Sequence, residues 1–176
     1  MTTSHTDDYD YGIIGNGRTC ALIDSKASVV FLCMPDFDSG TVFASILDAE
    51  KGGQFGITME GGEAVSQEYE RHTGILVTRF EGDDGVFEVI DFMARYTWDG
   101  KAGAQHDVSS DVIRVLKHIS GKPKLRVHYD PRLEYGRLKT ESHLFDETRI
   151  KSTTTGKGSD GNDVYESCYL YTDFDP

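Results

Sequence analysis

The sequence predicts an all-β protein, an antiparallel β-sandwich with one short helix. Short runs of β-branched and aromatic residues recur along its 176 residues. The segments between these runs are rich in Gly and Asp, which favour tight turns. Short strands at regular spacing, joined by such turns, are typical of sandwiches and barrels. We expect one domain over residues 11–176, preceded by a disordered acidic tail over residues 1–10.

Each expected strand is a short apolar or alternating run bounded by turn signals. The expected strands are residues 11–14, 19–23, 28–34, 54–59, 75–80, 86–93, 111–120, 124–129 and 164–172. The first two flank Gly15-Asn16-Gly17, and Asn-Gly favours a hairpin because both turn positions need positive φ. Residues 28–34 are almost wholly apolar, as expected for a strand covered on both faces, and Pro35 ends the run.

One helix is expected after the strand that Pro35 ends. Its apolar residues recur at helical spacing and would share one face. These residues are Val42, Phe43, Ile46 and Leu47. Ser39 or Thr41 can cap its N-terminus, and Gly52-Gly53 would end it. Two segments are expected to be irregular, a polar loop over residues 98–110 and a Gly/Ser/Thr-rich, disordered excursion over residues 152–163.

The composition excludes several classes of function. Lys and Arg number 18 against 30 Asp and Glu, which gives a net charge of −12. Binding to nucleic acid or to an anionic membrane requires a clustered basic surface, so neither partner is expected. No apolar run is long enough to span a membrane. The N-terminus also lacks the basic start and apolar run of a signal peptide.

The cysteines and histidines predict no metal site and no cofactor. Cys20, Cys33 and Cys168 are widely spaced and form no CxxC pair. We interpret them as reduced core thiols, which favours a cytoplasmic location. His118 and His128 lie on successive expected strands and could face each other. No Cys, Asp or Glu at ligand spacing accompanies them, however.

The loop after Pro35 is the candidate site. Asp36, Phe37, Asp38 and Ser39 combine two carboxylates, an aromatic ring and a hydroxyl. Carboxylates accept paired hydrogen bonds from sugar hydroxyls, and a ring can stack on the C–H face of a sugar. The alternative is structural, with Asp38 or Ser39 capping the helix and Phe37 packing as its hydrophobic staple. The residues alone favour the structural interpretation.

Several blocks resemble a known enzyme family. Residues 14–19 (IGNGRT) and 32–39 (LCMPDFDS) resemble the N-terminal signature of bacterial and archaeal family 15 glycoside hydrolases. These are the glucoamylase, glucodextranase and trehalase-like enzymes. The similarity continues in order through residues 42–44, 52–55, 69–80, 89–93 and 129–137. Asp36 departs from the pattern, since many family members have Arg there, and residues 26–31 replace a commoner Gly-Ser-Ile-x-Trp.

The resemblance implies a large antiparallel sandwich, a supersandwich, followed by an (α/α)6 barrel. In the family, two Glu residues of the barrel hydrolyse α-glucosidic bonds with inversion, which needs carboxylates about 6.5–9.5 Å apart. This chain ends before such a barrel could begin. We therefore expect a non-catalytic, truncated N-terminal domain that packs on the barrel of the same polypeptide. An α-glucan or trehalose-like sugar would bind only through the full enzyme, and no catalytic residue is assigned here.

The same resemblance gives the candidate loop a position. In the full enzyme we expect the loop to face the barrel, with Asp38 and Ser39 fixing the helix start and Phe37 filling the joint. Arg18 is the expected ion-pair partner of Asp36 or Asp38, in an orienting role.

Two alternative functions remain open, and self-association of the chain is expected. The chain could be a stand-alone carbohydrate-binding module, with Trp98 as the best single candidate, or an unrelated all-β interaction domain. Residues 164–171 are β-prone and carry one charge, so a truncated sandwich would expose them as an edge. We expect the fragment to self-associate there.

Overall fold

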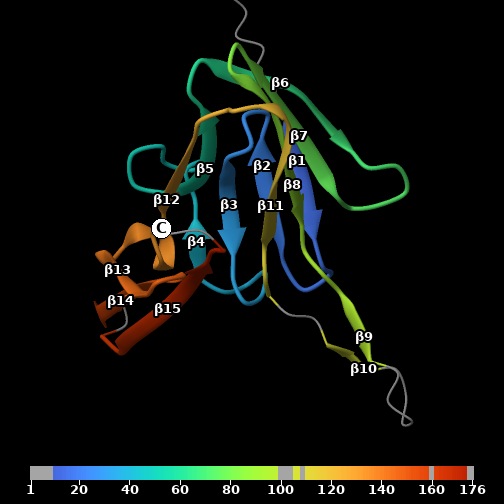
Figure 1. The fold of residues 1–176 in the computed structure, drawn as a ribbon. Coiled ribbons are helices and arrows are strands. Elements are labelled where there is room, and N and C mark those ends of the chain that lie inside the picture. Colours follow the sequence, from blue (N-terminus) through green and yellow to red (C-terminus); the bar gives the residue numbers. More distant parts are fainter. Residues whose placement is uncertain (1–9, 99–104, 108–109, 159–160, 174–176) are drawn as a thin grey trace, which may run out of the picture.

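The computed structural model describes residues 10–98, 105–107, 110–158 and 161–173 (Figure 1). In these residues the chain forms strands grouped in four sheets, and every strand pair is antiparallel. The predicted all-β antiparallel sandwich is confirmed. The acidic tail predicted over residues 1–10 lies, apart from Asp10, outside the described residues.

The largest sheet has six strands in the order β1-β2-β3-β5-β12, with β4 paired to β3. Its strands are β1 (Tyr11–Gly15), β2 (Cys20–Asp24), β3 (Val29–Cys33), β4 (Thr41–Phe43), β5 (Gln54–Met59) and β12 (Leu125–Asp130). The hairpin predicted at Asn16-Gly17 is present, because Gly15 pairs with Cys20. Its loop spans residues 16–19, and Gly17, at φ 85°, takes the positive φ there, whereas Asn16 does not.

The second sheet has four strands in the order β11-β8-β7-β6. Its strands are β6 (Gly62–Tyr69), β7 (Leu76–Gly82), β8 (Gly85–Phe92) and β11 (Ile113–Gly121). Alternate side chains of β8, those of Phe87, Val89 and Asp91, are buried. Because side chains alternate across a strand, this pattern turns one face of the sheet toward the core.

The core lies between these two sheets. One cluster joins β1, β2 and β3 to Leu76 of β7, and it includes Ile14 and Leu32. A second cluster joins Ile57 of β5 to Phe80 and Phe87 of the other sheet, whose rings stack with centroids 4.6 Å apart. The sandwich is therefore held by burial of apolar side chains from both sheets.

A single tyrosine also links the two sheets at the β1 edge. Tyr69 is the last residue of β6, and its hydroxyl accepts a hydrogen bond from the Ile13 N–H at 2.7 Å. The same hydroxyl donates to the Ile13 carbonyl at 2.8 Å. The backbone groups of Ile13 that face away from β2 are thus already satisfied by a side chain.

Two smaller sheets complete the fold. The first contains β13 (Thr140–Asp146), β14 (Arg149–Lys157) and β15 (Asp163–Tyr171), with β14 in the centre. It lies at one end of the sandwich, beside β4 (Figure 1). The second contains β9 (Tyr96–Trp98) and β10 (Gln105–Asp107), which extend away from the sandwich.

The predicted helix is wrong. Residues 41–43 form β4 instead, with Cys33 paired to Thr41 and Leu32 to Phe43. Thr41, Val42 and Phe43 are all buried, whereas an amphipathic helix would bury one stripe. Ile46 and Leu47 lie exposed in the turn that follows. Pairing with β3 therefore overrides the helical spacing, and the structure describes only one helical element, a 3₁₀ turn at Glu134–Gly136 (η1).

Two further expectations are corrected. The segment predicted as a disordered excursion over residues 152–163 begins inside β14, where Ser152 and Thr154 are buried. His118 and His128 do not face each other, because β11 pairs with β8 and β12 pairs with β5. No helix in the described part of the chain is long and apolar enough to cross a membrane.

Candidate functional site

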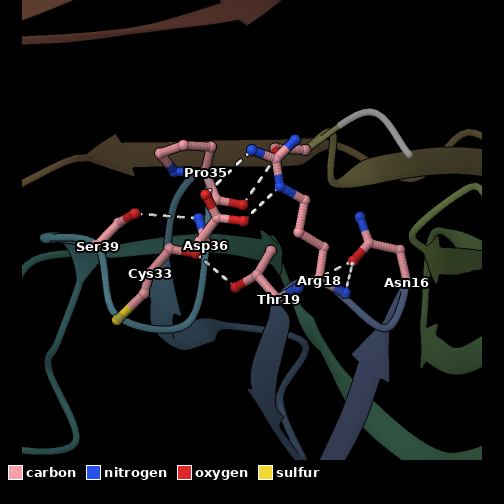
Figure 2. Close-up of polar contacts among 8 residues, drawn as sticks. Asn16, Arg18, Thr19, Cys33, Pro35, Asp36 and Ser39 are labelled. Carbon is pink, nitrogen blue, oxygen red and sulfur yellow. Dashed lines mark hydrogen bonds and ion pairs between the residues drawn. The ribbon is translucent and has the colours of Figure 1, made fainter. Parts of the chain in front are cut away.

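The candidate loop, residues 34–40, connects β3 to β4 and is fixed by hydrogen bonds along its length (Figure 2). Inside the loop, the Asp36 N–H donates to Ser39 Oγ at 3.1 Å, and the Ser39 N–H donates to the Asp36 carbonyl at 3.1 Å. From outside, Ser110 Oγ donates to the Pro35 carbonyl at 2.9 Å. The loop backbone is thus held both internally and by a distant segment.

A second loop, between β1 and β2, carries Arg18 toward the first. Asn16 is buried, and its Oδ1 accepts hydrogen bonds from the N–H groups of Arg18 at 2.9 Å and Thr19 at 3.0 Å. Thr19 Oγ1 in turn donates to the Cys33 carbonyl at 2.6 Å, at the end of β3. Asn16 acts here through its side chain, in an Asx-type turn, while the adjacent glycine takes the positive φ.

Arg18 and Asp36 form the ion pair that joins the two loops, as predicted. Arg18 Nε donates to Asp36 Oδ1, and Arg18 Nη2 donates to Asp36 Oδ2 at 3.0 Å. The guanidinium hydrogen bond holds the pKa of the Asp36 carboxyl below its usual range. The side chains are 45% and 39% exposed, so the pair adds little to stability but fixes both side chains in one geometry.

The loop presents its remaining side chains to solvent. Phe37 is 61% exposed and Asp38 is also exposed. The structural interpretation, in which Asp38 or Ser39 caps a helix and Phe37 packs as a staple, is therefore wrong, because no helix follows. Ser39 serves instead as the acceptor for the Asp36 N–H. The Phe37 ring and the Asp38 carboxylate are left exposed on a fixed loop, and these groups can contact a ligand or another domain.

A cavity of about 930 Å³ opens beside this loop. Its wall is shared by the candidate loop, by the first residues of β11 and by β15 at the far side. The polar residues on this wall are Ser39, Thr41, Ser110, Asp111, Arg114, Tyr129, Glu134, Glu166, Ser167, Tyr169 and Tyr171. Apolar side chains such as Leu32, Phe43 and Val112 form the rest. The predicted site residues thus reach this cavity only through Ser39.

Glu134 and Tyr135 were not predicted as site residues, yet they pack directly against the loop. The Tyr135 N–H donates to Thr41 Oγ1 at 2.9 Å. A Cβ on Gly40 would lie 2.1 Å from Glu134 Oε1, so only glycine fits at this position without a shift of that carboxylate. Both Glu134 and Tyr135 have positive φ, at 56° and 58°, a conformation that costs free energy in non-glycine residues. Both residues lie in the block 129–137 that resembles the enzyme family, but the sequence did not indicate this contact.

A buried ion pair behind the cavity was also missed. Asp91 and Arg114 face each other across β8 and β11, with Arg114 Nε donating to Asp91 Oδ1 at 2.7 Å and Nη2 donating to Oδ2 at 3.1 Å. Arg114 Nη1 also donates to the Phe55 carbonyl of the opposite sheet at 2.7 Å, and Nη2 donates to the Ala27 carbonyl. Desolvation raises the pKa of Asp91, and the Arg114 charge opposes that rise.

The three cysteines are free thiols, and they lie on three different strands of the fold. Cys33 is buried, whereas Cys20 and Cys168 are half-buried. Burial raises the pKa of the Cys33 thiol, against a hydrogen bond with Tyr135 that lowers it. Within the described residues, no group of three or more His, Cys, Asp or Glu side chains is placed to hold a metal ion.

Comparison with known proteins identifies relatives over most of the chain. The family model described as "Trehalase-like, N-terminal" matches residues 9–156. Trehalase from Thermoplasma volcanium is 32% identical over 132 residues, which cover 73% of this chain and 20% of that protein. Trehalase from Mycolicibacterium smegmatis is 29% identical over 140 residues, covering 73% of this chain and 21% of that protein.

A third relative is similar over a shorter stretch. Trehalase 2 of Sulfolobus acidocaldarius is 43% identical over 84 residues, which cover 48% of this chain and 14% of that protein. The chain thus spans about a fifth or less of the length of these relatives. No solved structure matches the fold significantly. The matched residues contain both loops, the Arg18–Asp36 ion pair and the Asp91–Arg114 pair, and we conclude that the chain belongs to the trehalase-like N-terminal domain family.

Proposed function

We propose that this chain is the non-catalytic N-terminal domain of an enzyme that hydrolyses α-glucosidic bonds, of the trehalase or glucoamylase type. The family match over residues 9–156 carries the proposal, together with relatives named trehalase that are several times longer. The catalytic acid and base belong, in this proposal, to an (α/α)6 barrel of the same polypeptide. The free thiols support a cytoplasmic location.

The domain would act by packing on that barrel and shaping the rim of its sugar site. The candidate loop suits this role because its backbone is fixed while Phe37 and Asp38 project outward. Side chains on a loop held at several points keep one geometry, which positioning of a ligand requires. We assign Asp36 and Arg18 the task of orienting the loop, Phe37 the contact with the barrel, and Asp38 with Ser39 the rim nearest the sugar.

The first experiment measures hydrolysis by the isolated chain. Trehalose, maltose, starch and dextran should all remain uncleaved, because the acid/base pair is assigned to the absent barrel. Turnover abolished by a single carboxylate substitution within the chain would contradict the proposal. Turnover that survives every such substitution would indicate a contaminant, and repurification to constant specific activity settles that point.

The second experiment tests the loop in an active enzyme. The matching N-terminal segment of the Thermoplasma volcanium trehalase is replaced by this chain, and trehalose hydrolysis by the chimera is measured. The chimera should hydrolyse trehalose, whereas the trehalase without any N-terminal segment should not. Asp36→Ala in the chimera should lower kcat/KM while the melting temperature stays nearly constant. Glu141→Ala is the matched control, since Glu141 also forms an exposed ion pair, with Lys139 at 2.8 Å. Equal kcat/KM values in the two variants would mean that the loop has only a structural role.

The alternative functions, a stand-alone sugar-binding module or an unrelated interaction domain, predict a different result. Either one would leave the chimera inactive even when it is folded. The module interpretation depended on Trp98. The backbone of Trp98 belongs to β9, but the structure does not describe its side chain.

A further inference from the structure

One face of the small sheet carries a cluster of exposed aromatic side chains. Phe145 is 50% exposed, and Tyr165, Tyr169 and Tyr171 are 60%, 40% and 66% exposed. We call these four residues the aromatic face. Single exposed apolar residues are ordinary on protein surfaces, but a group of large rings, three of them in contact with one another, marks a binding surface.

The strand geometry places these rings side by side. The positions of Tyr165, Tyr169 and Tyr171 differ by even numbers along β15, with Ser167 between the first two, so their side chains leave the same face of the sheet. Phe145 meets Tyr169 edge-on with ring centroids 5.9 Å apart, and Tyr169 lies 6.1 Å from Tyr171. At about 3.4 Å per residue, the row from Tyr165 to Tyr171 is roughly 20 Å long. It is therefore an extended strip and not a single-ring pocket.

Two cations from the central strand hold the rings in place. The Arg149 guanidinium carbon lies 4.8 Å from the Phe145 centroid and 6.0 Å from that of Tyr171. Lys151 Nζ lies 5.6 Å from the Tyr169 centroid, and the nearby hydroxyls of Tyr165 and Tyr169 raise the pKa of Lys151. Cation–π contacts of this kind reduce the rotamer freedom that a ligand would otherwise have to remove.

The charged groups named on this face are one ion pair and one further cation. Arg149 forms an ion pair with Asp146, and Lys151 is engaged by phenol groups. The chain as a whole carries −12, which disfavours an anionic ligand. The surface therefore offers ring faces bordered by hydroxyl groups, an ion pair and one ammonium group, all of which can hydrogen-bond to sugar hydroxyls. These groups match a neutral ligand that has a C–H face and a rim of hydroxyls.

We propose that the aromatic face binds neutral oligosaccharides by stacking their sugar rings along β15. The aromatic face differs from the loop residues assigned above, although Tyr169 and Tyr171 also border the cavity beside that loop, and it requires no catalytic barrel. Its length favours a chain of several sugar units over a disaccharide. In the full enzyme, such a surface would hold a longer glucan or another neutral polysaccharide near the protein, beyond the hydrolysis assigned above.

The test measures sugar binding by the purified 176-residue chain. Titration calorimetry with maltoheptaose, and native gel electrophoresis through gels that contain soluble starch or dextran, should both detect binding. Tyr171→Ala removes the most exposed ring and should weaken binding about 3- to 10-fold, as expected for one aromatic contact. Tyr171→Phe retains the ring and should stay within about 2-fold of the unmodified chain.

Tyr11→Ala is the matched control, because Tyr11 is an exposed tyrosine on β1 of the other sheet. It should leave binding unchanged. Absence of binding to all three sugars, or equal losses in the Tyr171→Ala and Tyr11→Ala variants, would overturn the proposal. So would an effect of Tyr171→Ala on sedimentation alone, which would make this face a contact between copies. Because no hydrolysis is measured, failure here is distinct from failure of the trehalase chimera.

Discussion

At the scale of single residues, the most consequential side chain is one that no sequence motif announces. Arg114 is 4% exposed and Asp91 is fully buried. Arg114 satisfies the carboxylate on its own sheet and two carbonyls across the interface, and it lies 4.7 Å from the centroid of the Phe55 ring. A buried charge is tolerated only when its hydrogen bonds are complete, so this residue ties the two sheets together.

Removing the cation should therefore be costly. In Arg114→Met, the Asp91 carboxylate would be left buried and unpaired, and the free energy of unfolding should fall by about 3–5 kcal/mol. The double variant Arg114→Met/Asp91→Leu removes both charges and should recover part of that loss. Urea denaturation of both proteins measures the difference. A loss below about 1 kcal/mol in the single variant would show that water or another group solvates Asp91.

The Arg18–Asp36 pair predicts a measurable shift in titration. Arg18 lowers the pKa of Asp36, so the ionised carboxyl is the form that the fold favours. Its contribution is present above the unfolded pKa of about 3.9 and is lost as the pH falls through the lower, folded value. Carboxyl chemical shifts followed by NMR should show this low pKa, and Arg18→Gln should raise it. An unchanged pKa in Arg18→Gln would mean that the pair does not form in solution.

At the scale of elements, the β1 and β15 edges differ in whether their backbone groups have hydrogen-bond partners. The β1 edge is occupied at Ile13 by the Tyr69 hydroxyl. In the described part of the chain, β15 pairs only with β14, so one side of its nine residues carries unpaired backbone groups. A long, weakly charged edge strand of this kind readily accepts another strand. The association expected from the sequence thus remains a proposal, with β15 as its contact.

A lysine on that edge should prevent association. We expect the chain to self-associate with rising concentration through addition of strands at β15, and Ser167→Lys to shift it toward the monomer by charge repulsion between edges. Thr58→Lys, at an exposed position of β5, adds the same charge away from β15 and should have no effect. Sedimentation velocity over a concentration series distinguishes the three proteins. A strict monomer at high concentration of the unmodified chain would contradict the expectation.

At the scale of the whole molecule, the sandwich was predictable because its inner strands have local signals. Apolar runs and alternation marked residues 29–33 and 85–92 to within a few residues. The strand over residues 62–69 was missed because it is a mostly exposed edge strand with polar side chains. Residues 41–43 were assigned to a helix because the alignment with β3 that buries them depends on tertiary pairing.

In the candidate site, too, contacts near marked strand ends were predictable, whereas contacts that depend on tertiary packing were not. Arg18 and Asp36 follow strand ends that the sequence marks, so their pairing could be anticipated. The pair of Asp91 with Arg114 depends on the register of β8 against β11, and the approach of Glu134 to Gly40 depends on packing between distant segments. Neither contact leaves a pattern in the local sequence.

The molecule as a whole should be insensitive to chelators and reductants. Its three cysteines are free, and the described residues form no group suited to a metal. EDTA or dithiothreitol should therefore leave the melting temperature unchanged. A decrease of more than about 5 °C, roughly 1 kcal/mol for a domain of this size, would reveal a structural ion or cystine. Differential scanning calorimetry with and without each reagent makes the comparison.

The approach of Glu134 to Gly40 has an evolutionary consequence. Any side chain at position 40 would displace the end of the flexible Glu134 side chain, while a shorter residue at position 134 would leave that space open. A larger residue at position 40 should therefore occur together with a displaced Glu134 side chain or with a shorter residue at position 134 among trehalase-like N-terminal domains. Gly40→Ala becomes a means of moving the Glu134 carboxylate in the cavity wall without substituting Glu134 itself. Natural variation at position 40 would tune the shape of that wall in the same way.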